Sequence, residues 1–294
     1  MNTMKLKLAL PLLVAIAYGP NLALAAPLLG SDLASFAVLG AAGVTNVPIS
    51  TIGGNLGSAP NASVGGGYVF SSGSLQQNTA IAQNAQIELD AAILALNAFS
   101  STSTFMSNVA AITYNPGVYD GGAVNLGAAV TLDGGGSNSA VWIFRTTSTL
   151  VTATTASVSV TNVGNGANVG IYWVVGSAAT LNGPQFVGNV LAHDLISSDG
   201  DLNLPCGRLL SANTQVTLIH DAISLGCTNV IDASGVVNNY AASGGFDQGA
   251  ATGSGGTGGS GGQVVNGVPE PVSLALVGLG LGLAGLGGLR HRKA

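Results

Sequence analysis

Two histidine–aspartate pairs are the residues with the clearest potential for acid–base or metal chemistry. His193-Asp194 and His220-Asp221 repeat one another, and Asp199 and Asp201 lie between them in the chain. An imidazole beside a carboxylate can serve as a general base or bind a metal ion. Such polar residues are also common in turns, where they accept backbone hydrogen bonds. We expect turn residues at the corners of coils here, and no metal or catalytic site. Asp199-Gly200-Asp201 could help to bind calcium, but the chain has no series of Gly-Gly-x-Gly-x-Asp repeats.

Secreted polysaccharide hydrolases and lyases are the enzyme classes that these residues could still suggest. A hydrolase needs two facing carboxylates, and Asp194 and Asp221 are the only pair that the sequence offers. A lyase needs a cation beside an acidic sugar, for which only Arg145 and Arg208 are present between the chain ends. We expect Arg208 to pair with a neighbouring aspartate instead. The sequence therefore favours a protein that is not an enzyme.

The composition is poor in charge and rich in glycine. Of 294 residues, 45 are Gly and 6% are charged, whereas an average soluble domain has about 7% Gly and about 25% charged residues. Between residues 27 and 289 two arginines accompany all twelve acidic residues, a net charge of −10. This balance excludes nucleic acid as a partner, because phosphates require Lys and Arg. The low charge and the recurring Val, Ile and Leu also exclude a disordered chain.

The N-terminal residues have the pattern of an export signal. Two lysines precede an apolar run over residues 8–17, and an Ala-x-Ala pattern follows. This order is typical of a secretory signal peptide. We expect residues 1–25 to be that signal, with signal peptidase cutting after Ala25 in preference to Ala26.

The C-terminal residues have the pattern of a sorting signal. Residues 272–289 carry no charge and are long enough to span a bilayer, and basic residues follow. Val268-Pro269-Glu270-Pro271 stands directly before them. Residues 268–294 together resemble a PEP-CTERM sorting signal. The resemblance implies processing by an exosortase in a Gram-negative bacterium, with transient anchoring in the inner membrane. A permanent single-span anchor is the alternative, and in both cases the body is extracellular or on the outer surface.

One domain lies between these signals. Residues 241–267 are mostly Gly, Ser and Thr, a composition typical of a flexible linker. The folded domain is therefore expected over residues 26–240.

One long helix is expected in that domain. Residues 76–99 contain no Gly or Pro, and Ser74 and Gln77 have the spacing of a capping box. Apolar residues recur at helical spacing. They are Ile81, Ala85, Leu89, Ala92 or Ile93, and Leu96. We expect an amphipathic helix over about 76–99 that lies along the outside of an elongated body.

The rest of the domain predicts short strands in repeated coils. Gly188–Ala192 recurs as Gly207–Ser211, a shift of 19 residues, and Thr180–Pro184 recurs as Asp201–Pro205, a shift of 21. Repeats near 20 residues with short strands and small turn residues indicate a β-solenoid. Stacked coils form parallel ladders with strands about 4.8 Å apart.

The two cysteines fit this repeat. Cys206 and Cys227 are 21 residues apart, about one coil, and export would place them in an oxidising compartment. We expect a disulfide between neighbouring coils near the C-terminal end of the domain. Two buried thiols are the alternative.

An ordered set of segments over about residues 30–225 resembles the DUF3494 ice-binding protein family. The segments are Ser35–Gly40, Ile52–Gly57, Asn115–Tyr119, Ala140–Phe144, Trp173–Leu181, Phe186–Ala192 and Gly207–Leu210. The resemblance implies a mainly β fold, a discontinuous right-handed parallel β-helix with one long α-helix packed alongside. It also implies ice binding through a flat face of the solenoid.

The expected face is uncharged and made of Thr, Ser and Ala. The family often shows a Thr-Ala/Gly-x-Thr/Asn motif there, which Thr152–Thr155 matches and Ser177–Thr180 matches with Ser for Thr. Three more threonines lie beside inward-looking apolar residues of expected strands. The expected face residues are Thr131, Thr149, Thr152, Thr154, Ser177, Thr180 and Thr217. The alternative is that these threonines simply suit β-strands.

The sequence thus predicts an exported, monomeric body that needs no cofactor and whose partner is the surface of an ice crystal. Its action would be antifreeze or inhibition of ice recrystallisation. An extracellular adhesin or biofilm matrix protein that binds polysaccharide is the alternative, since the sorting signal suits that role equally well.

Overall fold

The computed structural model describes residues 28–241 and 244–247. The expected signal peptide, the sorting motif and the expected membrane span lie outside these residues. Within the described part of the chain, no helix has the length and apolar character needed to cross a membrane.

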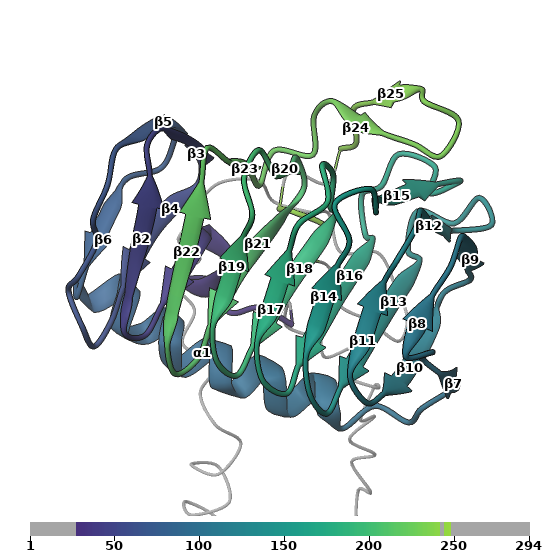
Figure 1. The fold of residues 1–294 in the computed structure, drawn as a ribbon, viewed down its shortest axis with the longest axis horizontal. Helices are drawn as coiled ribbons and strands as arrows, with labels where there is room; N and C mark the ends of the chain where they lie inside the picture. The colour runs from purple at the N-terminus through teal and green to yellow at the C-terminus, as the bar shows by residue number, and fades with distance from the viewer. Residues whose placement is uncertain (1–27, 242–243, 248–294) are drawn as a thin grey trace, which may run out of the picture. The chain divides into compact units, whose positions relative to one another are not determined.

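The described residues form a three-sided solenoid in which the strands of neighbouring coils pair in parallel (Figure 1). The first side is a nine-stranded sheet. In spatial order its strands are β6 (Leu75–Gln77), β4 (Asn55–Ser58), β1 (Phe36–Gly40), β21 (Gly207–Ser211), β18 (Gly188–Ala192), β16 (Gly170–Val175), β13 (Val141–Thr146), β10 (Gly117–Gly121) and β7 (Ser103–Thr104).

The second side is a seven-stranded sheet. Its strands are β2 (Gly43–Val47), β22 (Gln215–Ile219), β19 (Ile196–Ser198), β17 (Ala179–Leu181), β14 (Leu150–Thr152), β11 (Val124–Leu126) and β8 (Asn108–Val109).

The third side consists of two smaller sheets and a hairpin. Its strands are β20 (Asn203–Leu204), β23 (Ala222–Ser224), β3 (Ser50–Gly53) and β5 (Tyr68–Ser72) in one sheet, β15 (Val158–Thr161), β12 (Val130–Asp133) and β9 (Ile112–Tyr114) in the other, and the antiparallel pair β24 (Val230–Ile231) and β25 (Val237–Asn238).

The stack is discontinuous in sequence. The chain builds the coils at one end first, runs along the body as the helix α1 (Ala80–Asn97), and then winds back from the other end. The last coil meets the first, so that Leu39 of β1 is in register with Leu210 of β21. Thr45 of β2 is likewise in register with Thr217 of β22. The expectation of a discontinuous parallel solenoid with one helix alongside is therefore confirmed.

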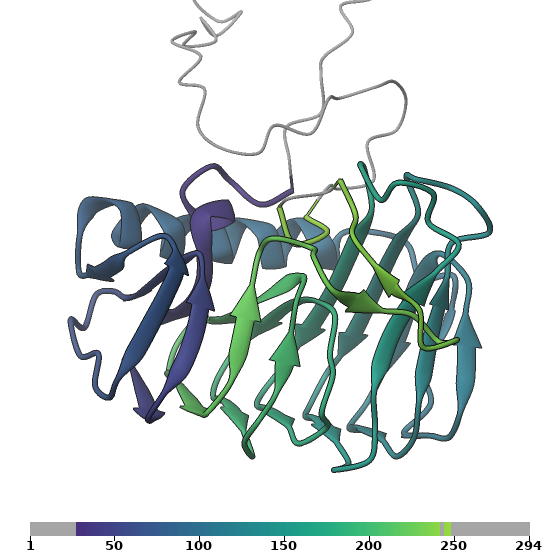
Figure 2. The same cartoon turned by 90° about the horizontal axis from the view of Figure 1, so that it is seen from above.

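Helix α1 covers the nine-stranded sheet along its length (Figure 2). It is capped by Thr79, whose hydroxyl oxygen accepts a hydrogen bond from the backbone N–H of Ala82 at 3.3 Å. The expected start at residue 76 and the capping box at Ser74 and Gln77 are wrong, because residues 75–77 pair with β4 as strand β6. The buried stripe is Ala82, Ala85, Leu89, Ala92 and Leu96, while Ile81 is exposed.

Two apolar layers hold the body together. One fills the inside of the solenoid, where Trp142 and Trp173 are buried and each indole N–H donates to a backbone carbonyl. Phe144 stacks on Trp173 with ring centroids 4.2 Å apart, one coil above the other. The second layer lies between the nine-stranded sheet and α1. The two tryptophans are therefore part of the packed core inside the solenoid.

The coil repeat and the disulfide expected from the sequence are largely confirmed. Gly188–Ala192 pairs residue by residue with Gly207–Ser211, a shift of 19. Cys206 and Cys227 are bonded. The 21-residue shift from Thr180 to Asp201 does not predict the pairing of strands, because Thr180 of β17 pairs with Ser197.

Arg145 joins α1 to the solenoid. Its guanidinium holds the carboxylate of Asp120 with two hydrogen bonds, at 2.6 and 2.8 Å. The same group donates to the carbonyls of Leu96, Asn97 and Phe99 at the C-terminal end of the helix. These carbonyls have no partner within the helix, and the helix dipole makes that end favourable for a cation.

Arg208 joins three separate segments of the chain. It is fully buried and donates to Asn189 of β18, to the carbonyl of Ala34 and to Asp247, as expected for an arginine beside an aspartate. Phe246 is also fully buried. The expected linker over 241–267 is therefore wrong at its beginning, since Phe246 and Asp247 pack on the body.

Replacing Arg145 by Met should lower the free energy of unfolding by about 2–4 kcal/mol, because Asp120 and the last carbonyls of α1 lose their partner. The guanidinium lowers the pKa of Asp120. A carboxylate with a lowered folded pKa stabilises above its unfolded pKa of about 3.9 and loses that effect as the pH falls. Urea denaturation should therefore show the stability difference between the wild type and R145M narrowing below about pH 4, with the part that comes from the helix-end carbonyls retained.

The matched control is Asp90→Asn, which removes an exposed charge from the same helix and should change stability by no more than about 0.5 kcal/mol. Equal stability of R145M and the wild type at pH 7 would contradict this role for Arg145.

Candidate functional site

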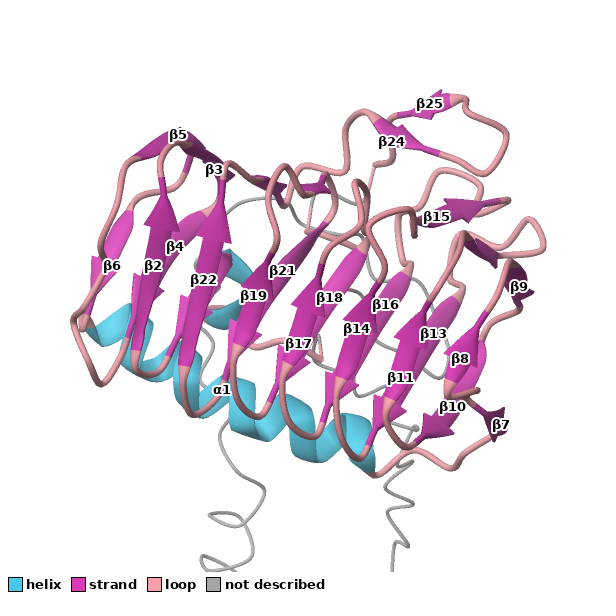
Figure 3. Ribbon diagram, viewed as in Figure 1, coloured by secondary structure: helices cyan, strands magenta, loops and turns pink. Residues whose placement is uncertain are grey.

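The outer surface of the seven-stranded sheet is the open side of the solenoid. In Figures 1 and 3 its strands face the viewer, with no helix or hairpin of the described chain in front of them. Figure 2 shows α1 along a different side. We call this surface the open face.

One outward residue from each strand forms a straight row across the open face. Strand register fixes the row, because each member is the Cα partner of the next. In spatial order the row is Thr45, Thr217, Ser197, Thr180, Val151, Asn125 and Asn108. We call these seven residues the central row.

The central row is neutral, and hydrogen bonds join its hydroxyl groups in two pairs. Thr45 donates to the hydroxyl of Thr217 at 3.2 Å, and Ser197 donates to that of Thr180 at 3.4 Å. All seven residues are exposed or half-buried. The strands of the sheet contain no charged residue. The row therefore offers hydroxyl, methyl and amide groups at the spacing of a β-ladder, about 4.8 Å.

The neighbours of the central row point inward and hold it in place. Val216 and Leu218 flank Thr217, and Ala179 and Leu181 flank Thr180, all of them buried in the core of the solenoid. Alternation along a strand sends successive side chains to opposite faces, so a packed inner row fixes the outer one.

The structure brings several of the expected face residues onto or beside the open face. Thr180 and Thr217 belong to the central row. Thr149 directly precedes β14, two residues before Val151. Ser177 and Thr154 lie in the bends on either side of the sheet, before β17 and after β14.

Two of the expected face residues lie elsewhere. Thr152 points into the body and is 3% exposed, and its hydroxyl oxygen accepts from the backbone N–H groups of Asn182 and Gly183. Thr131 lies in β12, on the third side. The motif match misplaced Thr152 because Val151 is the outward residue of β14, and alternation along the strand turns its neighbour Thr152 inward.

Five members of the central row were not among the expected residues. They are Thr45, Ser197, Val151, Asn125 and Asn108. The signal that could have found most of them is a small residue between two inward ones, as in Val124-Asn125-Leu126. In strands of two or three residues this alternation is too short to stand out as a period.

The two histidine–aspartate pairs lie apart in the fold. Asp194 precedes β19 and Asp221 follows the neighbouring parallel strand β22, so the two carboxylates lie at opposite ends of these strands. Asp221 is buried and accepts hydrogen bonds from Ser198, Ile219 and Leu202. Burial raises the pKa of Asp221, and these hydrogen bonds oppose that rise. Asp221 is therefore a structural turn residue.

His193 is an exposed neighbour of Asp194, with 3.0 Å between Nδ1 and Oδ1. Among the described residues, no group of three or more His, Cys, Asp and Glu side chains is placed to hold a metal ion. What the described residues do assemble is an ordered array of neutral groups that can hydrogen-bond to water.

Comparison with known proteins identifies the family. The sequence profile described as Ice-binding-like matches residues 38–224. An ice-binding protein of Nostoc sp. (strain HG1) is 33% identical over 197 residues, which are 66% of this chain and 72% of that protein.

Solved structures of ice-binding proteins share the fold. One from the Antarctic ascomycete Antarctomyces psychrotrophicus is 29% identical with a TM-score of 0.58, over 66% of this chain and 96% of that chain. One from an Antarctic biological consortium is 26% identical with a TM-score of 0.62, over 76% and 96%. The family match spans every strand of the open face, and the chain belongs to the Ice-binding-like family.

Proposed function

We propose that this protein binds ice through the open face, and that it acts as an antifreeze or recrystallisation-inhibiting protein without enzymatic activity. The observation that carries the proposal is the central row, an uncharged line of seven outward residues fixed by strand register. The family match supports the same function.

The shape of the open face suits a crystal surface. Ordinary sheets twist, whereas stacked coils can keep a face flat over many strands. Hydroxyl and amide groups at a regular spacing can hold water molecules by hydrogen bonds. Threonine methyl groups and Val151 leave the water between these anchors free to adopt the arrangement of an ice plane.

The absence of charge from the open face supports this function as well. A charged side chain orients water strongly around itself, in a geometry that does not match a neutral lattice. The charged residues near the sheet lie in its bends, such as Asp194 and Asp199, rather than in its strands. The neutral strands therefore leave a continuous patch for the crystal.

The terminal signals complete the proposal. We propose export through residues 1–25, sorting through Val268-Pro269-Glu270-Pro271 by an exosortase, and a transient membrane anchor at 272–289. The body would then work as a monomer on the outside of a Gram-negative cell. We also infer a right-handed winding of the coils, because crossovers between parallel strands of one sheet are right-handed in nearly all proteins.

Thr180→Tyr should remove most of the ice activity without unfolding the protein. A large ring in the middle of the central row prevents the planar contact, and a loss equivalent to about 1.4 kcal/mol of binding corresponds to about tenfold. Thermal hysteresis and recrystallisation inhibition measure the effect, and circular dichroism checks the fold.

The matched control is Thr113→Tyr, which adds the same ring at an exposed threonine of β9 on the third side. We expect T113Y to shape ice like the wild type. Equal activity of T180Y and T113Y would mean that the open face is not the ice-binding surface.

A pair of valine variants should separate stability from ice binding. Thr152→Val removes the acceptor of two backbone N–H groups, so we expect the free energy of unfolding to fall by about 1–3 kcal/mol. Thr180→Val removes a half-exposed hydroxyl and should change stability by at most about 0.5 kcal/mol. Urea denaturation measures both, and the reverse order would place Thr152 outside the core.

A further inference from the structure

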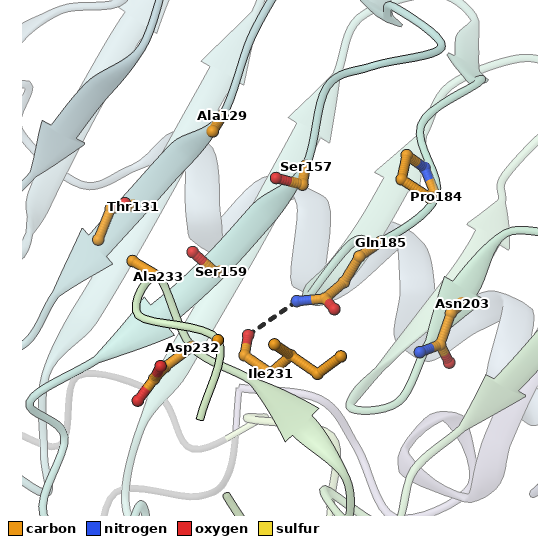
Figure 4. Close-up of a pocket in the computed structure, with 11 residues that line it drawn as sticks. Ala129, Thr131, Ser157, Ser159, Pro184, Gln185, Asn203, Ile231, Asp232 and Ala233 are labelled. Carbon is orange, nitrogen blue, oxygen red and sulfur yellow. Dashed lines mark hydrogen bonds between the residues drawn. The ribbon is translucent and has the colours of Figure 1, made fainter. Parts of the chain in front are cut away.

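A groove on the third side is a second surface on which polar groups gather. It lies where the three-stranded sheet meets the hairpin β24–β25, and its volume is about 520 Å³ (Figure 4). Three groups of residues line it. They are Ala129, Thr131, Ser157 and Ser159 from the sheet, Pro184, Gln185 and Asn203 from the following coils, and Ile231, Asp232, Ala233 and Gly235 from the hairpin.

The floor of the groove is an ordered grid, as on the open face. Thr131 is the register partner of Ser159. Two residues earlier, Ser157 is bridged to Gln185, and Gln185 is bridged to Asn203 on the next coil. Polar side chains therefore stand in two rows with the spacing of the coils.

Several of these polar groups have no protein partner. Within the described residues, the side chains of Thr131, Ser157, Ser159 and Asn203 make no hydrogen bond to another protein group. All four residues line the groove. Polar groups without a protein partner are paired by water or by a ligand that reaches them. The floor therefore has free donors and acceptors that point into a recess.

The wall of the groove is held rigidly. Asp232 accepts hydrogen bonds from Ser234, Val236 and Asn238 within the hairpin. Gln185 donates to the carbonyl of Ile231 at 2.8 Å, which ties the hairpin to the floor. A preformed site loses little entropy when it binds a ligand.

The chemistry of the lining selects among ligands. No lysine or arginine lines the groove, so an acidic sugar or a phosphate finds no cation there. A peptide that binds as an added strand needs a free sheet edge, whereas β12 is paired on both sides and the edge strand β15 has β24 of the hairpin packed against it. Hydroxyl and amide groups beside Pro184 and Ile231 can instead contact the hydroxyl and C–H surfaces of a sugar ring.

We propose that this groove binds a neutral oligosaccharide, as a second site on the solenoid. A planar crystal cannot reach a recessed floor, so the groove does not depend on ice binding by the open face. One chain would then hold ice on one side and an uncharged polysaccharide on another.

The test uses the folded body with its disulfide intact. Affinity electrophoresis through gels that contain dextran, laminarin or galactomannan, with alginate as the acidic comparison, measures retardation. Titration calorimetry with an oligosaccharide of the retarding polymer then gives the affinity. The variants are Ser157→Phe, which fills the groove, and Asn203→Leu, which removes an amide at nearly constant volume.

We expect at least one neutral polymer to retard the wild type and alginate to leave it unaffected. Both groove variants should bind about tenfold more weakly, a change that corresponds to about 1.4 kcal/mol, while they still shape ice. T180Y should bind the sugar normally, which separates this proposal from that for the open face. Binding to none of the neutral polymers, binding to alginate alone, or unchanged affinity in both groove variants would overturn the proposal.

Discussion

The parallel hydrogen-bonded register between coils is the constraint on which every surface of this protein depends. A row of side chains is straight only if each strand stacks on the next without slipping, and a slip of one residue would turn the inner row outward. The critical point is where the first and last coils meet. There Thr45 is placed beside Thr217, although they are 172 residues apart. Arg208 holds the same junction by joining the carbonyl of Ala34 to Asn189 and Asp247.

The outward residues decide what each side of the solenoid becomes. On the nine-stranded sheet the outward row includes Leu39, Leu210 and Leu191, which α1 buries with its own apolar stripe. On the seven-stranded sheet the equivalent row is Thr, Ser and Asn, which gain nothing from an apolar cover. The backbone is the same on both sides. The difference between a covered and an open side is therefore made by about one side chain per strand.

The sequence predicted features that depend on long or strongly constrained patterns. The helix, the 19-residue register and the Cys206–Cys227 bond are examples. It failed where a short segment had competing partners. Residues 75–77 suit a helix locally, yet they pair with β4. Two members of the central row were predicted and five were not, because strands of two or three residues show too little alternation. Likewise Phe246 lies in a stretch of linker composition, and only tertiary packing reveals its burial.

The open face and the groove differ in shape more than in chemistry. Both surfaces present uncharged hydroxyl and amide groups on parallel strands. The two arginines of the body bind other parts of the protein, Arg145 at the end of α1 and Arg208 in the core. Neither surface therefore has a cation to select an anionic ligand. What separates them is the hairpin β24–β25, which raises a wall on the third side and leaves the seven-stranded sheet bare. A flat array can match a crystal plane, whereas a walled one admits only a ligand of limited width. In this fold, the placement of one short hairpin is enough to make an open face on one side and a walled groove on another from strands of similar chemistry.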